Sequence, residues 1–124
     1  MTTAGKLAQA RDAALSSGAA VFDLVTAGGS IRQAFFDAVG GALPLDPPLV
    51  GSRSWDALSD SVWGGLDSLD TRAIVITWRD ASTFKDVAPW EFEIASSILH
   101  DLVKRLASWE ATYGEPKQVS VLLA

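Results

Sequence analysis

The sequence predicts a small α/β fold in which helices pack on a three-stranded parallel sheet. Three segments, residues 20–27, 72–79 and 117–123, have the β-branched and aromatic composition of strands. The connections between them carry apolar residues at the helical spacing of three and four. Strands that alternate with helical crossovers pair in parallel, with the helices over the sheet. At 124 residues and 48% hydrophobic, the chain has room for one such domain with a real core.

The N-terminal segment predicts a helix that stands apart from this pattern. Residues 4–17 are rich in alanine, have only a weakly apolar side and end at Gly18. We expect residues 1–18 to form an N-terminal helical extension that packs loosely or frays. Residues 19–124 are then expected to form a single domain.

The first strand is expected to lead directly into a helix. A glycine pair ends the strand at residues 20–27, and Ser30 is a plausible N-cap for a helix that begins at Ile31. The apolar period continues as far as Ala42. The second strand, residues 72–79, is continuously apolar at its centre, which is typical of a strand covered on both faces.

The second crossover predicts one long helix. Residues 80–89 are a mixed connection, and an amphipathic helix is expected from about Trp90 to Thr112 with Trp109 at the end of its apolar stripe. Trp78 occupies an apolar position of its strand, and we expect it to lie in the core.

Residues 43–54 predict an irregular loop in front of a further helix. Three prolines and a glycine exclude regular structure, yet the segment is more apolar than a solvated linker. A loop of this length is more often functional than incidental. Ser54 is expected to cap a helix that starts at Trp55, with Trp55 itself in the core, and Gly64-Gly65 is expected to end it.

This helix carries the pattern with the clearest functional meaning. Asp56 and Asp60 are four residues apart and share one face, where like charges cost a helix a few tenths of a kcal/mol. No basic residue follows them before Arg72. Two interpretations are open at this point: a solvated helix face that carries two aspartates, or an acidic pair kept for a partner.

The charge distribution favours a basic partner. The formal charge is -5, and residues 43–70 hold five aspartates against Arg53 alone, a net of -4. Such a field repels nucleic acid and draws basic molecules in, so we expect no direct nucleic-acid binding. It determines association rather than fold.

Several other functional classes find no support in the sequence. There is no cysteine and no run of 18 apolar residues, and charges near the N-terminus argue against a signal peptide, so a cytoplasmic protein without a membrane span is expected. His100 is the only histidine, lacks an orienting partner, and is expected at the surface or half-buried. The glycine pairs lack nucleotide-binding spacings. No catalytic residue, cofactor or metal site is predicted.

These residues, together with the order of the elements, resemble the barstar family of intracellular ribonuclease inhibitors over roughly residues 20–124. The matching positions are Leu43-Pro44, Gly51, Asp56-Ala57-Leu58, Asp60 and Thr77-Trp78-Arg79. The resemblance implies an inhibitor that binds through the second helix of the domain, which begins at Trp55, and through the loop before it. It also implies that Asp60 takes the place of a substrate phosphate in a ribonuclease active site, with Asp56 as its companion.

The resemblance also implies a set of partner-binding residues on the loop and helix. They are Val50, Gly51, Arg53, Asp56, Ser59, Asp60 and Trp63. Trp63 is equally compatible with a core position and an interface anchor, and Arg53 either contacts the partner or, as we favour, pairs with a neighbouring aspartate.

Departures from the family pattern point to a different target. Pro47-Pro48 stand where the family has tyrosines, and Ser59 replaces a tryptophan. On the last helix, the family has an acidic residue that contacts the partner, and Lys104 is the candidate for that position here. The expected partner is therefore a cognate basic ribonuclease toxin, such as a domain of a bacterial contact or secretion system, with this chain as its immunity protein.

Two alternatives belong to other classes. A small enzyme would use Asp56 and Asp60 as metal ligands or as an acid/base pair, but no third ligand is in sight. A non-inhibitory binding module would use the same acidic surface for another basic protein, because a fold does not determine a function.

Overall fold

The computed structural model describes residues 1–27, 31–49, 51 and 54–124. The predicted cap Ser30 and the glycine pair before it lie outside these residues. Within them the elements are α1 (Ala4–Ser16), β1 (Ala20–Leu24), α2 (Ile31–Ala42), α3 (Trp55–Asp67), β2 (Ala73–Trp78), α4 (Ala81–Val87), α5 (Pro89–Ala107) and β3 (Gln118–Leu123).

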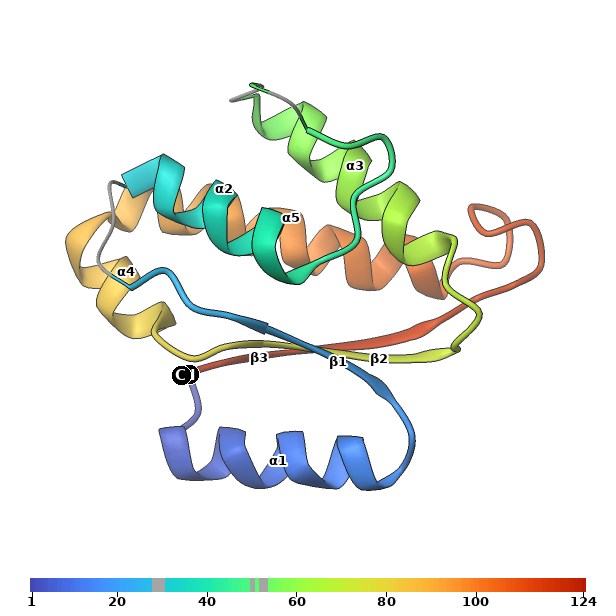
Figure 1. Ribbon diagram of the computed structural model, residues 1–124, viewed down its shortest axis with the longest axis horizontal. Helices are drawn as coiled ribbons and strands as arrows, with labels where there is room; N and C mark the ends of the chain where they lie inside the picture. Colours follow the sequence, from blue (N-terminus) through green and yellow to red (C-terminus); the bar gives the residue numbers. More distant parts are fainter. Residues whose placement is uncertain (28–30, 50, 52–53) are drawn as a thin grey trace.

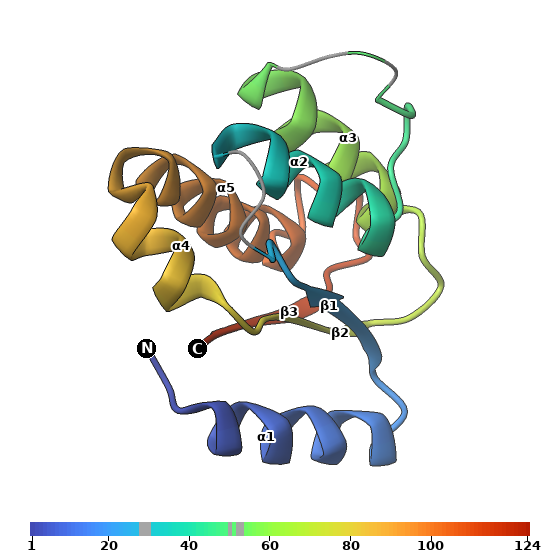
Figure 2. The ribbon, with the colours of Figure 1, turned by 60° about the vertical axis from the view of Figure 1, so that its left-hand side comes forward.

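The three strands form the predicted parallel sheet in the order β1-β2-β3. The register pairs Ala20 with Ile74 and Ile76 with Val121. Figures 1 and 2 show α2, α3 and α5 above one face of the sheet and α1 alone on the other. Of these helices, α3 lies farthest from the sheet.

Trp78 is the centre of the core, as predicted. Its side chain is fully buried, and its ring lies 5.1 Å from that of Phe35, 5.2 Å from Phe84 and 5.6 Å from Phe92. Trp55 is half-buried at the border of this aromatic cluster, where its ring contacts Phe35 at 5.9 Å. β2 thereby connects both helical crossovers through one side chain.

A short helix, α4, occupies the segment that we expected to be a mixed connection. Ala81 and Phe84, three residues apart, are both buried and attach this turn of helix to the core. Pro89 then stands in the first turn of α5, where the missing N–H is not needed. The sequence did not predict α4, because two apolar positions are too few to establish a helical period.

α5 ends at Ala107, earlier than the predicted end at Thr112. The Ser108 side chain accepts a hydrogen bond from the N–H of Ala111 at 3.1 Å and turns the chain out of the helix. Trp109, which we expected in the apolar stripe, is 69% exposed. The apolar spacing continued in the sequence past the point where the backbone leaves the helix.

α1 is not loosely packed, contrary to our expectation. Leu7 is buried against the sheet, and the Arg11 guanidinium donates hydrogen bonds to both carboxylate oxygens of Asp23 on β1, the shortest at 2.8 Å. The Thr77 hydroxyl donates to the same carboxylate at 2.6 Å. The bond from Arg11 lowers the pKa of Asp23 below its ordinary value and outweighs the effect of burial. The division between residues 1–18 and 19–124 stays a prediction.

Asp80 joins the ends of β1 and β2 and carries a first testable prediction. Its carboxylate accepts hydrogen bonds from the N–H and hydroxyl of Thr26, both at 2.9 Å, and from the N–H of Ala27 at 2.6 Å. Burial would raise the pKa of Asp80, but these bonds outweigh it and lower the pKa. Asp80→Ala is expected to reduce the free energy of unfolding at pH 7 by about 2 kcal/mol.

The pH dependence of this loss distinguishes the carboxylate from packing. A carboxylate whose pKa is lowered by folding stabilises the folded state fully at pH values above the ordinary aspartate pKa of 3.8. Its contribution to the free energy of unfolding decreases progressively as the pH falls below that value. Urea unfolding should therefore show the difference between wild type and Asp80→Ala shrinking in acid. A difference that stays constant with pH would contradict this explanation, and Asp86→Ala, at an exposed position of α4, is the control.

Candidate partner-binding surface

α3 begins and packs as its sequence predicts. The Ser54 hydroxyl accepts a hydrogen bond from the N–H of Ala57 at 3.3 Å and caps the helix. Leu58, Val62 and Leu66, at spacings of four, are each 2% exposed or less and face the core. This inner face holds the orientation of the helix.

The opposite face of α3 is a row of three acids and one tryptophan. Asp56, Asp60, Trp63 and Asp67 follow one another at spacings of four, three and four, so they share one side of the helix. We call these four residues the outer row. Ser59, the other predicted contact on this helix, is half-buried beside it. The sequence prediction included all of these residues except Asp67.

Asp56 and Asp60 are both exposed on this face of α3. Among the residues that the structure describes, neither carboxylate has a hydrogen bond or an ion pair. Two of the three predicted contacts on the loop, Val50 and Arg53, lie outside the described residues. Within the described residues, no ion pair or hydrogen bond of Asp56 or Asp60 has to be broken before a partner can bind.

Gly64 and Gly65 hold the loop on α3 and do not end the helix, which corrects the prediction. A Cβ on Gly65 would overlap the carbonyl oxygen of Pro44, and one on Gly64 would overlap that of Asp46. The N–H of Asp46 also donates to the carbonyl of Ser61 at 3.0 Å. The helix continues past both glycines to Asp67, and their missing side chains make room for the loop backbone. This continuation is also why the sequence prediction missed Asp67.

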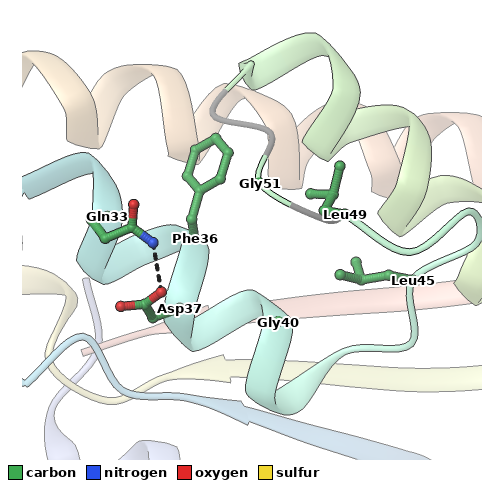
Figure 3. Close-up of a pocket in the computed structure, with 7 residues that line it drawn as sticks. All are labelled: Gln33, Phe36, Asp37, Gly40, Leu45, Leu49 and Gly51. Carbon is green, nitrogen blue, oxygen red and sulfur yellow. Dashed lines mark hydrogen bonds between the residues drawn. The ribbon is translucent and has the colours of Figure 1, made fainter.

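A cavity of about 340 Å³ separates the loop from α2 (Figure 3). The residues that line it are Gln33, Phe36, Asp37, Gly40, Leu45, Leu49 and Gly51. The Gln33 amide donates to Asp37 at 2.7 Å and holds a further carboxylate at the cavity. The predicted contact Gly51 therefore lies in a hollow, with a positive φ of 71°. Sequence analysis missed Asp37 because it stands on another helix.

Trp63 is half-buried and lies under a cation from the last helix. The Arg105 guanidinium carbon lies 4.4 Å from the centre of a Trp63 ring, a distance typical of a cation–π contact. The sequence left open whether Trp63 is core or anchor; in the structure it packs at the border of the core and belongs to the outer row. Arg105, and not its neighbour Lys104, makes the contact with α3.

The described part of the chain offers little for other kinds of site. No group of three or more acidic, histidine or cysteine residues is arranged to hold a metal ion there. None of the described helices combines the length and the apolar character that crossing a membrane requires. His100 is exposed on α5, as predicted, with Nδ1 2.8 Å from the carbonyl oxygen of Ser96.

The fold and the surface define a small α/β protein that displays an acidic helix, braced from below by an aromatic core and from the side by a loop. A family model described as Barstar (barnase inhibitor) matches residues 7–121, and the chain belongs to the barstar family. The match starts within α1, earlier than the resemblance noted from residue 20. Comparison with curated proteins and with solved structures gave no match.

Proposed function

We propose that this protein is the immunity protein of a barnase-type ribonuclease toxin and blocks the toxin's active site with α3 and the preceding loop. The observation that carries the proposal is the pair of exposed carboxylates, Asp56 and Asp60, on one turn of a firmly packed helix, neither of which pairs with any described residue. It acts as a stoichiometric inhibitor and not as an enzyme. Membership of a family described as barnase inhibitors supports this direction.

The chemistry of the target explains why carboxylates suit this role. A ribonuclease binds the phosphates of RNA with arginine, lysine and histidine side chains, and a carboxylate set against guanidinium forms charge-assisted, bidentate hydrogen bonds. In a dry interface these bonds offset the cost of removing both charges from water. Asp60, at the middle of the outer row, is the group that we assign to the phosphate position, with Asp56 one turn earlier.

The packing of α3 reduces the cost of binding. Leu58, Val62 and Leu66 hold the helix in the core, and Gly64 and Gly65 hold the loop against it. A surface that is already ordered loses little conformational entropy on association. The net charge of -4 over residues 43–70 adds long-range attraction toward a basic enzyme.

A titration of enzyme activity tests the proposal. The purified protein is added to a purified barnase-type ribonuclease from the same organism, and RNA cleavage is followed at increasing ratios of the two proteins. We expect cleavage to stop at one inhibitor per enzyme, and the association rate to fall as salt rises. A ribonuclease of unrelated fold should remain active. Full cleavage in excess inhibitor, with no complex by calorimetry, would refute the proposal and favour a non-inhibitory module for another basic protein.

A further inference from the structure

We propose that Arg105 determines specificity: its guanidinium, held over Trp63, selects a partner that presents a hydrogen-bond acceptor, foremost a carboxylate, opposite the second half of α3. This inference rests on the proposed function and adds a second charge requirement to it. The partner surface is then basic opposite Asp56 and Asp60, and acidic or neutral opposite Arg105.

The first support is the position of the contact. α3 and α5 pack against each other, and their side chains Trp63 and Arg105 meet at 4.4 Å. Trp63 lies in the outer row, three residues after Asp60. A protein that covers Asp60 and the rest of the row therefore also covers the Trp63–Arg105 pair.

The second support is what Arg105 does not bind. Its ring partner Trp63 stands between Asp60 and Asp67 in the outer row, and Arg105 is exposed. Nevertheless it forms no ion pair with either aspartate, or with any other carboxylate in the described ranges. The positive charge is thus placed beside the acidic row without being neutralised by it.

The third support is the chemistry of a guanidinium above an aromatic ring. The cation–π contact uses the face of the guanidinium and leaves the N–H donors at its edge. Because Arg105 is exposed, these donors face solvent in the free protein. A partner that excludes the water must replace it with acceptors, because buried unpaired donors are costly. A carboxylate matches the edge of the guanidinium in two parallel bonds, and a facing lysine or arginine is repelled.

Two charge reversals at adjacent positions separate this role from a general effect of charge. Arg105→Glu and Lys104→Glu change the net charge by the same amount, and both side chains are exposed on α5. Only Arg105 lies over Trp63. With the same barnase-type ribonuclease, Arg105→Glu should raise the Kd by about 100-fold or more, whereas Lys104→Glu should raise it less than about fivefold.

If Arg105→Glu disturbs folding, a milder variant tests whether Arg105 selects the partner. Arg105→Gln removes the charge and keeps a similar stem, and it should raise the Kd by about tenfold with an unchanged urea unfolding midpoint. The effect should shrink when Trp63→Leu is already present, because the ring no longer holds the guanidinium. A residue that only braces α3 against α5 would lower the unfolding midpoint and leave the Kd of the folded protein unchanged.

The outcomes distinguish this inference from the proposed function. If Arg105→Glu binds as tightly as wild type, or if both reversals weaken binding equally, Arg105 does not select the partner, while loss of binding by Asp60→Ala still supports inhibition. If Asp60→Ala also leaves binding unchanged, the proposed function itself fails. If Arg105→Glu and Asp60→Ala both weaken binding and Lys104→Glu does not, both the inference and the proposed function stand.

Discussion

Replacement of Asp60 by alanine is expected to raise the Kd for the ribonuclease by about 1,000-fold, which corresponds to about 4 kcal/mol. The carboxylate is exposed in the free protein, so its removal costs no packing or hydrogen bond within the described structure. In the complex its loss leaves the enzyme's cationic groups buried without a counter-charge, which is the most costly single defect of an ionic interface. The unfolding temperature should stay within about a degree of wild type.

A matched aspartate controls for the loss of one negative charge. Asp86 is exposed on α4, away from the outer row, and Asp86→Ala should change the Kd by less than about threefold. Asp56→Ala, one turn from Asp60, should have an intermediate effect of about tenfold. Calorimetry at low and high salt measures all three variants. Equal effects of Asp60→Ala and Asp86→Ala would show that only the overall field matters and that no carboxylate enters the active site.

The largest effect on stability is expected from Gly65→Ala. A methyl group at this buried position would overlap the carbonyl of Pro44 and crowd the backbone of Leu45. Backbone atoms cannot rotate away as a side chain does, so α3 and the loop must separate, at a cost of about 3 kcal/mol or more. Urea unfolding measures the loss as a lower midpoint.

Another glycine in a helix provides the control for this substitution. A Cβ on Gly41 of α2 would meet no atom within 4 Å, and Gly41→Ala should stabilise the protein by up to about 1 kcal/mol. The loop that Gly65 positions also carries Gly51, so Gly65→Ala should weaken ribonuclease binding even where the variant is folded. A Gly65→Ala protein as stable as wild type would mean that the loop shifts without cost.

The helix α3 shows how far a sequence alone leads at this site. The inward spacing of Leu58, Val62 and Leu66 placed Asp56 and Asp60 on the opposite side, and the structure confirms both faces. This succeeds because the helical period is a property of consecutive residues, and burial of one face leaves the other face for solvent or a partner. The roles of the two aspartates stay a prediction until binding is measured.

The misses share a physical cause. The end of α3 was misplaced because glycine commonly ends helices, whereas Gly64 and Gly65 are small so that the backbone at Pro44 and Asp46 can approach. That approach joins segments about twenty residues apart, and no local pattern records it. Arg105 was overlooked for the same reason, since its partner Trp63 lies on a different helix.

By itself, the sequence determined the strands, the parallel α/β order and the acidic outer face of α3, because these depend on composition and on the periods of consecutive residues. The tertiary structure alone decided that the loop rests on Gly65, that α1 is held to the sheet by Arg11 and Asp23, and that Arg105 stands over Trp63. Each of these depends on distance between segments remote in the chain. Such distances exist only once the core around Trp78 has brought the elements together.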